Sequence, residues 1–550
     1  MKVKNNLVLC FLSGAIVGVC FFISIYGFNV LNVTNISWLY NKGDLMQHQI
    51  GWQAFRMSEW YFPLGLHDGL TFPYKISVVY TDSIPLFAII FKCFSSVLPS
   101  QFQYIGIFGL LSFALQGGFG AILVHRFIRN IFVCCSASVL FLCNHVIIYR
   151  MFAHTALASQ WIILAALALW IYNKDITDKN TLIFWSVLLG LAPALHMYFV
   201  PILGVMLFFF CLMKFKEKGK IKRTFVLFLV PCLLSILVMF LLGVFYGGVE
   251  VGTNDILIYT MNLNNFINPI PIDHSDRVSL LLKPLPVDFG QYEGGCYLGL
   301  GVIAFLIVII FVNLIIRLKN KNKNNHIPYQ YAHPLRFYLI LMVLVFYILS
   351  LGTTVKLGTI QITNIWYPQF VLKILSIFRV TGRFIWPVYY LIFLYVIVKL
   401  REIFQDNKKF KLVVCLTVVV NLIDYSGMLI DYHNYYKQEF QRQTHLLNEQ
   451  WENIENKNII LLSDFQTGEL CDFGATLMKR GNSLNIFYLA RTPYNKIAGR
   501  INQILNDLKN KSLEKDAICI FRESDDISWI PKDAYEIVNL DGFTLIQNKN

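Results

Sequence analysis

The residues with the clearest chemical potential lie in one polar stretch, residues 43–65, with the sequence GDLMQHQIGWQAFRMSEWYFPLG. In a helix, Asp44 and His48 stand at i and i+4, on the same side. A carboxylate beside an imidazole can accept and relay a proton, which is general acid–base chemistry. We therefore predict Asp44 and His48 as catalytic residues. The alternative is that Asp44 only caps the helix, because aspartate is a favoured N-cap residue.

Two arginines are separated by four positions in the segment SIFRVTGRFIWP. In a helix, Arg379 and Arg383 would share one face. Guanidinium groups suit phosphate recognition because they are permanently charged and bind in a bidentate manner. We predict that both arginines bind a phosphate group. A surface pair, or salt bridges to Asp44 or Asp82, is the alternative.

Most other charged residues and histidines lie in loops between apolar segments, not within those segments. They include Arg56, Glu59, Asp82, Arg150, His154, His196, Asp273, His274 and Glu293. This distribution suits an enzyme at a membrane face better than an ion relay, which would keep ionised groups inside its spans. The candidate substrate-binding residues in this set are Arg56, Asp82, His154 and Glu293. Glu293 is a candidate for contacts with sugar hydroxyls, whereas His154 and His196 have hydrogen-bonded packing as the alternative.

The elements that must position these residues are apolar segments long enough to cross a bilayer. The chain has 550 residues, 56% of them hydrophobic, and a mean hydropathy of +0.55, which indicates a polytopic membrane protein. The net charge of +14 comes from basic residues clustered in short loops, where they set topology, so we expect no nucleic-acid partner. The pattern predicts a mainly α-helical module over residues 1–430 with about eleven transmembrane helices. It also predicts a cytoplasmic N-terminus and an extracytoplasmic first loop at residues 32–82.

The remaining residues, 431–550, have the composition of a soluble domain on the outer side. Apolar patches at 458–463, 485–490, 517–521 and 543–547 predict strands, and residues 496–509 have helical periodicity. We therefore expect a small extracytoplasmic α/β domain. Cys471 and Cys519 are the two cysteines of this tail, and they could pair in an oxidising compartment.

Taken together, an aspartate at the start of the first outer loop, interfacial helices behind it and many crossings resemble GT-C glycosyltransferases. A closer resemblance is to an uncharacterised bacterial membrane family related to that fold. It is carried over about residues 1–430 by GD-x-x-QH-x-x-GW-x-x-FR, TDSIPL at 81–86, FQY at 102–104, LQG at 115–117, HTALA at 154–158 and FR-x-x-GRF-x-WP-x-YY at 378–390.

The resemblance implies inverting transfer of a sugar from a polyprenyl-phosphate donor to a cell-envelope glycan or lipid-linked acceptor. The transfer would occur at the outer face of the bacterial inner (plasma) membrane, with membrane lipids around the enzyme. The first-loop aspartate of the fold, here Asp44, acts as the base or orients the acceptor hydroxyl. Some members carry a lysine before a Pro-Pro-Leu segment that touches the lipid phosphate. This chain has TDSIPL there, so the phosphate role moves to Arg379 and Arg383.

Some relatives use a divalent metal such as Mg²⁺ or Mn²⁺, which Asp44 could hold with His48 or with Asp82. Two other functions compete with transfer. A flippase or transporter of lipid-linked glycans would show internal repeats and polar residues inside its spans, and the sequence has neither. A polysaccharide polymerase would also use lipid-linked glycans and outer-loop arginines, but the large polar tail and the Asp44 loop favour a transferase. Neither the donor sugar nor the acceptor follows from the sequence.

Overall fold

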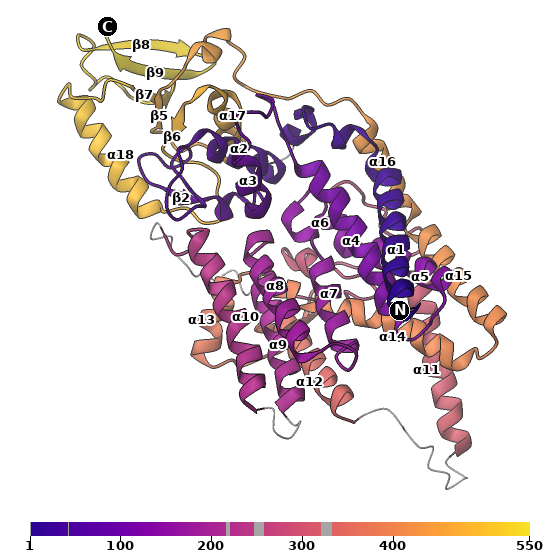
Figure 1. The fold of residues 1–550 in the computed structure, drawn as a ribbon. Coiled ribbons are helices and arrows are strands. Elements are labelled where there is room, and N and C mark those ends of the chain that lie inside the picture. The colour runs from indigo at the N-terminus through magenta and orange to yellow at the C-terminus, as the bar shows by residue number, and fades with distance from the viewer. Residues whose placement is uncertain (1, 42, 216–220, 247–257, 321–332, 550) are drawn as a thin grey trace.

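The computed structural model of the chain describes residues 2–41, 43–215, 221–246, 258–320 and 333–549. The structure is mainly helical, and its largest sheet, of five strands, lies in the C-terminal part of the chain. In Figure 1 this sheet and helix α18 lie at one end of the molecule, and the long helices lie at the other. The short elements of the first loop, among them α2 and α3, lie between the two (Figure 1).

Four described segments are long and apolar enough to cross a membrane. They are α1 (Lys2–Tyr26), α4 (Ile105–His125), α10 (Ile221–Leu241) and the segment Thr381–Ile403, which joins the 3-10 helix η7 (Thr381–Ile385) to α14 (Trp386–Ile403). A fifth candidate is the pair α15 (Asn407–Asp424) and α16 (Ser426–Lys437), which is bent by 56°. Among the described residues, helix length and composition thus identify four or five candidate spans, fewer than the predicted eleven.

Several predicted crossings are shorter or broken helices in the structure. The apolar segment 131–149 divides into α5 (Ile131–Leu142) and α6 (His145–Arg150). Asn144 starts the second helix, because its side chain accepts a hydrogen bond from the Ile147 amide at 3.2 Å. The other short or less hydrophobic helices are α7 (Trp161–Ile171), α8 (Asp178–Leu195), α9 (Phe199–Phe215), α11 (Leu300–Asn320) and α12 (His333–Ser350).

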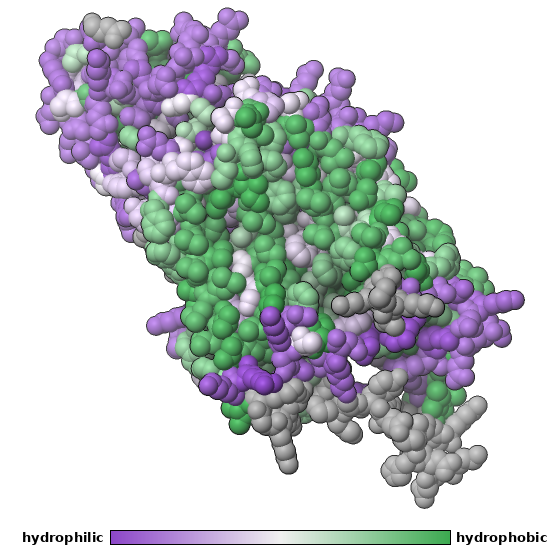
Figure 2. Space-filling view, in the orientation of Figure 1, coloured by the Kyte–Doolittle hydropathy of each residue, from purple (hydrophilic) through white to green (hydrophobic). Residues whose placement is uncertain are grey.

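The surface of the helical part has the polarity expected beside lipid. Figure 2 shows hydrophobic residues over the middle of the visible face and hydrophilic residues at both ends. On α10, Phe225, Leu233 and Phe240 are among many exposed apolar side chains. Apolar surface on this scale marks a site of contact with other molecules, and around helices of this length the natural contact is lipid.

The first loop folds into a compact unit of short elements. It contains η2 (Ser37–Asn41), α2 (Gly43–Met57), β1 (Leu66–His67), β2 (Ile76–Ser77), η3 (Val78–Thr81) and α3 (Pro85–Lys92). Residues 45–55 of α2 are buried, with Trp52 and Phe55 inside the hydrophobic core. The helix therefore lies between other parts of the protein, not on an open surface.

The C-terminal domain contains a mixed sheet of order β6-β5-β7-β9-β8. The predicted strands at 458–463, 517–521 and 543–547 correspond to β5 (Asn458–Leu461), β7 (Ala517–Arg522) and β9 (Phe543–Asn548). The predicted helix corresponds to α18 (Tyr494–Lys509), whereas β8 (Tyr535–Leu540) and α17 (Thr467–Leu477) had not been predicted. Strands β6, β5 and β7 are parallel, and β7, β9 and β8 are antiparallel.

The strand predicted at 485–490 is wrong. Strand β6 comprises Ser483–Leu484 only. It ends there because the Asn485 side chain, not the backbone, forms the hydrogen bonds to the amide and carbonyl of Leu461 in the neighbouring strand β5. Its Oδ1 accepts from the Leu461 amide at 2.9 Å, and its Nδ2 donates to the Leu461 carbonyl at 3.2 Å. The chain after Asn485 leaves the sheet and runs toward the first loop.

The C-terminal domain is joined to the first loop by backbone hydrogen bonds and by a shared core. The Phe72 amide donates to the Leu484 carbonyl at 2.8 Å, and the Leu484 amide donates to the Gly69 carbonyl at 2.8 Å. One hydrophobic core includes Ile50 of α2 and Phe473 of α17. Cys471 and Cys519, whose pairing the sequence left open, are free thiols in different core clusters.

Candidate functional site

Three segments distant in sequence meet where the first loop, the helical part and the C-terminal domain come together. At the centre is His154, which lies in the turn after α6 and between two carboxylates. Its Nδ1 is 3.7 Å from Oδ2 of Asp44, and its Nε2 is 3.7 Å from Oε1 of Glu293. The structure therefore brings together three of the residues that the sequence singled out.

Glu293 is held by two arginines. It lies in η6 (Gln291–Gly294) and accepts from Arg150 Nη1 at 3.2 Å on Oε1 and from Arg383 Nη2 at 2.8 Å on Oε2. Arg150 also donates to the Glu293 backbone carbonyl at 3.0 Å. Burial alone would raise the pKa of the Glu293 carboxyl, but Arg150 and Arg383 hold it well below its usual range. At neutral pH this group is an anion between two permanent cations.

The glycines next to Glu293 permit the close approach that this ion network needs. A Cβ atom on Gly382 would lie only 2.8 Å from the Cα atom of Gly294, so η6 and η7 touch through their backbones. Any larger side chain at either position would push the Arg383 segment away from Glu293. The paired glycines of the YEGG segment thus have a packing role in the site.

Asp44 is in the first turn of α2, and its side chain is 37% exposed. Its Oδ1 accepts a hydrogen bond of 2.9 Å from the hydroxyl of Tyr488, which belongs to the C-terminal domain. Gln47 holds the Tyr488 segment in place, because its Nε2 donates to the Tyr488 carbonyl at 2.8 Å. The domain outside the helical part therefore supplies a direct partner to Asp44.

Asp82 forms a second acid–imidazole pair at the same place. The Nε2 atom of His196, the residue that ends α8, is 3.4 Å from Oδ1 of Asp82. Burial would raise the pKa of Asp82, but His196, His48 and His154 lower it below its usual range. Asp82 adopts a left-handed conformation with φ of 52° between η3 and α3, a conformation that aspartate tolerates better than most residues.

His48 does not pair with Asp44 as predicted. Its ring is fully buried, and in the part of the chain that the structure describes neither ring nitrogen has a hydrogen-bond partner. Burial lowers the pKa of His48 to about 4, although Asp82 and Asp44 act in the opposite direction. The reason is that His48 lies in the second turn of α2, which faces the core, whereas Asp44 lies in the first turn and stays accessible.

Arg379 and Arg383 do not share a helical face. The helix α13 (Gln369–Ile377) ends before Arg379, and Arg383 lies in the separate 3-10 helix η7. Arg383 is buried against Glu293, whereas Arg379 is half-buried and lies within electrostatic range of Tyr488 and Tyr198. The break after Ile377 therefore gives the two arginines different surroundings.

Arg56 is at the other end of α2, twelve residues from Asp44, or about 18 Å along a helix axis. Its guanidinium donates to four backbone carbonyls, those of Ser95, Leu98, Pro99 and Ser100. Arg56 therefore holds the segment that follows α3 in place. The structure does not bring it to the Asp44 cluster.

Within the described ranges, no group of three or more His, Cys, Asp or Glu side chains is placed to hold a metal ion. The sequence left open whether Asp44 with His48 or Asp82 holds Mg²⁺ or Mn²⁺, and the described side chains there do not form such a group.

Buried polar atoms without partners line the same region. Both amide atoms of Asn265 and the hydroxyl of Thr155, next to His154, have no hydrogen-bond partner among the described residues. Asn265 is beside the Glu293 segment, because its Nδ2 would lie 3.2 Å from a Cβ atom on Gly294. Unpaired buried polar groups are rare in proteins and commonly mark bound water or ligand.

Sequence reasoning assigned no role to Arg150, Tyr488 or Asn265, and it left His196 between a functional role and hydrogen-bonded packing. The signal for Arg150 and His196 was their position in loops between apolar segments, which they share with His154. Tyr488 carried no such signal, because it lies in a segment predicted to be a strand of a separate domain.

One family model, described as a domain of unknown function (DUF6311), matches residues 15–426. No curated protein matches the chain. The matched region contains Asp44, Asp82, His154, Glu293 and Arg383, and it ends before the domain that contributes Tyr488.

Proposed function

This chain belongs to the DUF6311 family, and we propose that it is an integral-membrane glycosyltransferase of the GT-C type. It transfers a sugar from a polyprenyl-phosphate donor to a hydroxyl of a cell-envelope glycan or lipid-linked acceptor. The reaction takes place at the extracytoplasmic face of the bacterial inner membrane. In this proposal, about eleven segments cross the bilayer, several of them as short or broken helices.

The observation that carries the proposal is the environment of Asp44. This carboxylate is accessible, yet it is oriented from two sides by the Tyr488 hydroxyl and by His154. An accessible and oriented carboxylate is what a general base requires. Asp44 accepts the proton of the acceptor hydroxyl as that oxygen attacks the anomeric carbon. The bond from that carbon to the phosphate oxygen breaks, and polyprenyl phosphate leaves with the electron pair.

The leaving phosphate needs positive charge close to the end of the lipid. Arg379 suits this role because its side chain is half-buried and open to substrate, whereas Arg383 is buried against Glu293. Arg491 of the C-terminal domain is close to Arg379, since it donates to the carbonyl of Ile377 at 3.0 Å. A phosphate bound here would be stabilised by guanidinium groups from the helical part and from the C-terminal domain.

The helix before Arg379 offers a surface for the lipid chain. Helix α13 exposes Phe370, Ile374 and Ile377, and Trp366 just before it is 83% exposed. An amphipathic helix with an exposed apolar face suits the membrane interface. A polyprenyl chain lying along this face would present its phosphate to Arg379.

Sugar hydroxyls are bound by Asp82 and His196 in this arrangement. Glu293, which the sequence suggested for that task, is 6% exposed and fully engaged by Arg150 and Arg383. Its role is to position His154 and η7. Asp82 is more accessible, with 21% of its side chain exposed.

The decisive experiment is replacement of Asp44 in a deletion strain, followed by analysis of lipid-linked sugars and cell-envelope glycans. Asp44→Asn removes the base and keeps the shape, so transfer should fall by roughly 10²–10⁴. Asp44→Glu displaces the carboxylate and should also be badly impaired, because geometry matters as much as basicity. The matched control is Asp68→Asn in the same loop, since Asp68 also accepts a hydrogen bond from a tyrosine, Tyr61, at 2.6 Å.

Each outcome separates the competing functions. A flippase moves its substrate without taking a proton from a hydroxyl, so it should tolerate Asp44→Asn. Normal glycans in a well-folded Asp44→Asn strain would therefore rule out this transferase mechanism. Loss of transfer in Asp44→Asn together with normal transfer in Asp68→Asn would support it.

The proposed orientation has its own test. Reporter fusions at residues 220 and 440 should give opposite signals, cytoplasmic for the first and external for the second, because basic residues cluster near the first position. The same signal from both fusions would contradict the topology and place the Asp44 loop on the wrong face.

A further inference from the structure

The C-terminal domain has a concave region of its own, at the carboxyl ends of the parallel strands β5 and β7. From β5 the chain passes through α17 to β6 on one side of β5, and after β7 it continues to the antiparallel strands on the other side. The loops that follow β5 and β7 therefore diverge. In open α/β sheets, ligands bind outside the carboxyl ends of strands at such a switch point.

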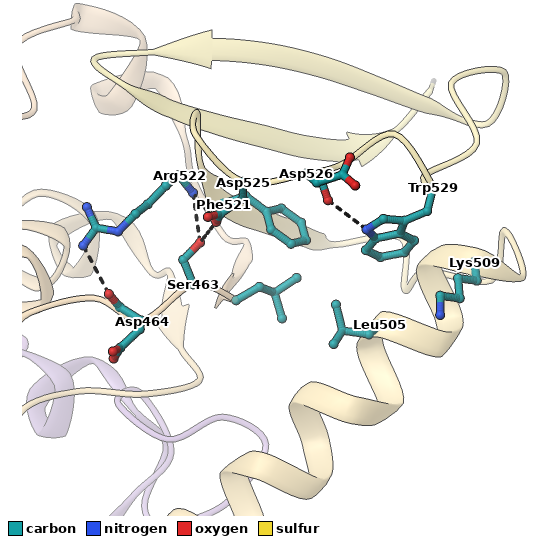
Figure 3. A pocket seen from close by; sticks show the side chains of 10 residues that line it. Ser463, Asp464, Leu505, Lys509, Phe521, Arg522, Asp525, Asp526 and Trp529 are labelled. Atoms are coloured by element: carbon teal, nitrogen blue, oxygen red, sulfur yellow. Dashed lines mark hydrogen bonds between the residues drawn. The ribbon is translucent and has the colours of Figure 1, made fainter.

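A cavity of about 750 Å³ opens at this switch point. Its wall includes Ser463 and Asp464 after β5, Asp525 and Asp526 after β7, Leu505 on α18, and Trp529 (Figure 3). The volume is within the usual range for pockets that bind small molecules, which is roughly 300–1,000 Å³.

Two side chains of the cavity wall, those of Asp525 and Trp529, are held in place by hydrogen bonds. Asp525 Oδ2 accepts hydrogen bonds from the Ser463 hydroxyl and from the Arg522 amide, the latter at 3.0 Å. The indole of Trp529 donates through Nε1 to the Asp526 carbonyl at 3.0 Å (Figure 3). A carboxylate and an aromatic ring are thus preorganised on the wall formed by the chain after β7.

The charges of the cavity disfavour phosphate groups and nucleotides. Three aspartates line it, and Arg522, one of its two cations, is engaged by Glu469 at 2.6 Å and by the Asp464 carbonyl at 3.1 Å. Glu469 also caps the N-terminus of α17 by accepting from the Gln466 amide at 2.7 Å. The helix terminus that holds phosphate in nucleotide-binding domains therefore already carries a carboxylate.

Carboxylates that accept hydrogen bonds and an aromatic ring that packs on C–H groups are the groups that recognise an uncharged sugar. Lys509, whose Nζ is 5.4 Å from the centre of the Trp529 ring, adds a donor for sugar oxygens. We propose that this cavity binds a neutral oligosaccharide, which places a glycan-binding site on the C-terminal domain apart from Asp44. The proposal does not depend on the glycosyltransferase function.

The test is ligand-observed saturation-transfer NMR on the full chain in lipid nanodiscs. The probes are neutral trisaccharides of glucose, galactose, mannose and N-acetylglucosamine, with uridine diphosphate and inorganic phosphate as charged probes. At least one trisaccharide should bind, and Trp529→Ala and Asp525→Asn should each weaken its binding by roughly tenfold. Tyr494→Ala is the matched control, since Tyr494 belongs to the same domain, is 63% exposed and does not line the cavity.

Thermal melting of each variant verifies that it is folded. If Trp529→Ala unfolds the domain, Asp525→Asn still tests the site, because it keeps the shape of the side chain. Binding that survives both substitutions, or absence of binding by all the trisaccharides, would overturn the proposal. Binding of the charged probes that is lost in the same variants would replace it with a phosphate site. Asp44→Asn should bind the trisaccharide normally, so failure here and failure of the transferase proposal are distinguishable.

Discussion

Glu293 and Asp44 contact the same imidazole from two regions of the molecule, and they differ in burial and in partners. Glu293 comes from the helical part, is 6% exposed and is held by Arg150 and Arg383. Asp44 is at the junction with the C-terminal domain, is 37% exposed and is held by Tyr488 and His154. One carboxylate is fully compensated by charge, whereas the other is oriented by lighter contacts and remains accessible.

The difference indicates how such a site divides its tasks. A buried carboxylate between two arginines is a fixed frame, because removing any member would leave a charge without a partner in a poorly solvated place. A group that must take up a proton needs access to substrate and freedom from a permanent counter-ion. Substitution of Glu293 or its arginines should therefore mainly lower stability, whereas substitution of Asp44 should mainly lower activity.

The largest effect on stability should come from Glu293→Gln. This change leaves Arg150 and Arg383 buried without their counter-ion, and breaking a buried pair typically costs roughly 3–5 kcal/mol. Asp44→Asn should change stability by less than about 0.5 kcal/mol, because the Asp44 side chain is 37% exposed and solvated. Thermal or chemical unfolding of the purified variants measures both. Equal stability losses in the two variants would mean that the distinction between frame and reacting group is wrong.

The next effect concerns the pH dependence of stability. The pKa of His48 falls from 6.5 to about 4 on folding, chiefly through burial, so the unfolded chain binds an extra proton between these values. Stability should therefore decrease as the pH falls from 6.5 to about 4, by about 3 kcal/mol from this residue alone. Below pH 4, loss of the anionic forms of Asp82 and Glu293, whose pKa values are lowered by their neighbours, should continue the decline.

The variant His48→Gln isolates this contribution. It should unfold with a shallower dependence on pH between 6.5 and 4 than the parent chain. His67 is another buried histidine of the first loop, and burial lowers its pKa to about 3. The pH dependence of unfolding of His67→Gln therefore serves as a comparison. If His48→Gln retains the full pH dependence, the pKa of His48 is not lowered on folding.

A smaller effect separates the two arginines. Arg379→Ala should raise the KM for the lipid-linked donor roughly tenfold with little change in stability, because it removes one charged contact to the phosphate. Arg379→Lys should keep part of that binding. Arg383→Ala should mainly destabilise the protein, since it removes a partner of Glu293. Normal donor binding by Arg379→Ala would show that the phosphate binds elsewhere.

The sequence was sufficient for several long helices and for some residues of the cluster around His154, but not for the geometry of that cluster. Apolar runs predicted α1, α4 and α10, because hydrophobic length is a local property. Local pattern also placed Asp44, Asp82, His154 and Glu293 in loops between apolar segments. It could not show that Arg150 would meet Glu293, since 143 positions separate them and only packing decides which partner a buried charge finds.

The C-terminal domain was the harder part for similar reasons. Alternating apolar residues at 485–490 resemble a strand, but one side chain, that of Asn485, ends the pairing by binding the backbone of Leu461. The helical face expected for Arg379 and Arg383 failed because α13 ends at Ile377. Both errors come from treating periodicity as sufficient when a tertiary contact decides where an element stops.

The smallest expected effect, on the turnover of Tyr488→Phe, tests whether the C-terminal domain takes part in the reaction. Tyr488→Phe keeps the ring in place and removes one hydrogen bond to Asp44, which is worth about 1 kcal/mol. If Tyr488 orients the base, turnover should fall severalfold while the KM for the donor stays the same, because the lost contact acts on the base and not on substrate binding. Tyr61→Phe is the matched control, since it removes the hydroxyl that donates to Asp68 at 2.6 Å in the same loop. Equal turnover in both variants would mean that the C-terminal domain only covers the first loop. A decrease confined to Tyr488→Phe would make the domain a part of the active site, although it lies outside the region that the family shares.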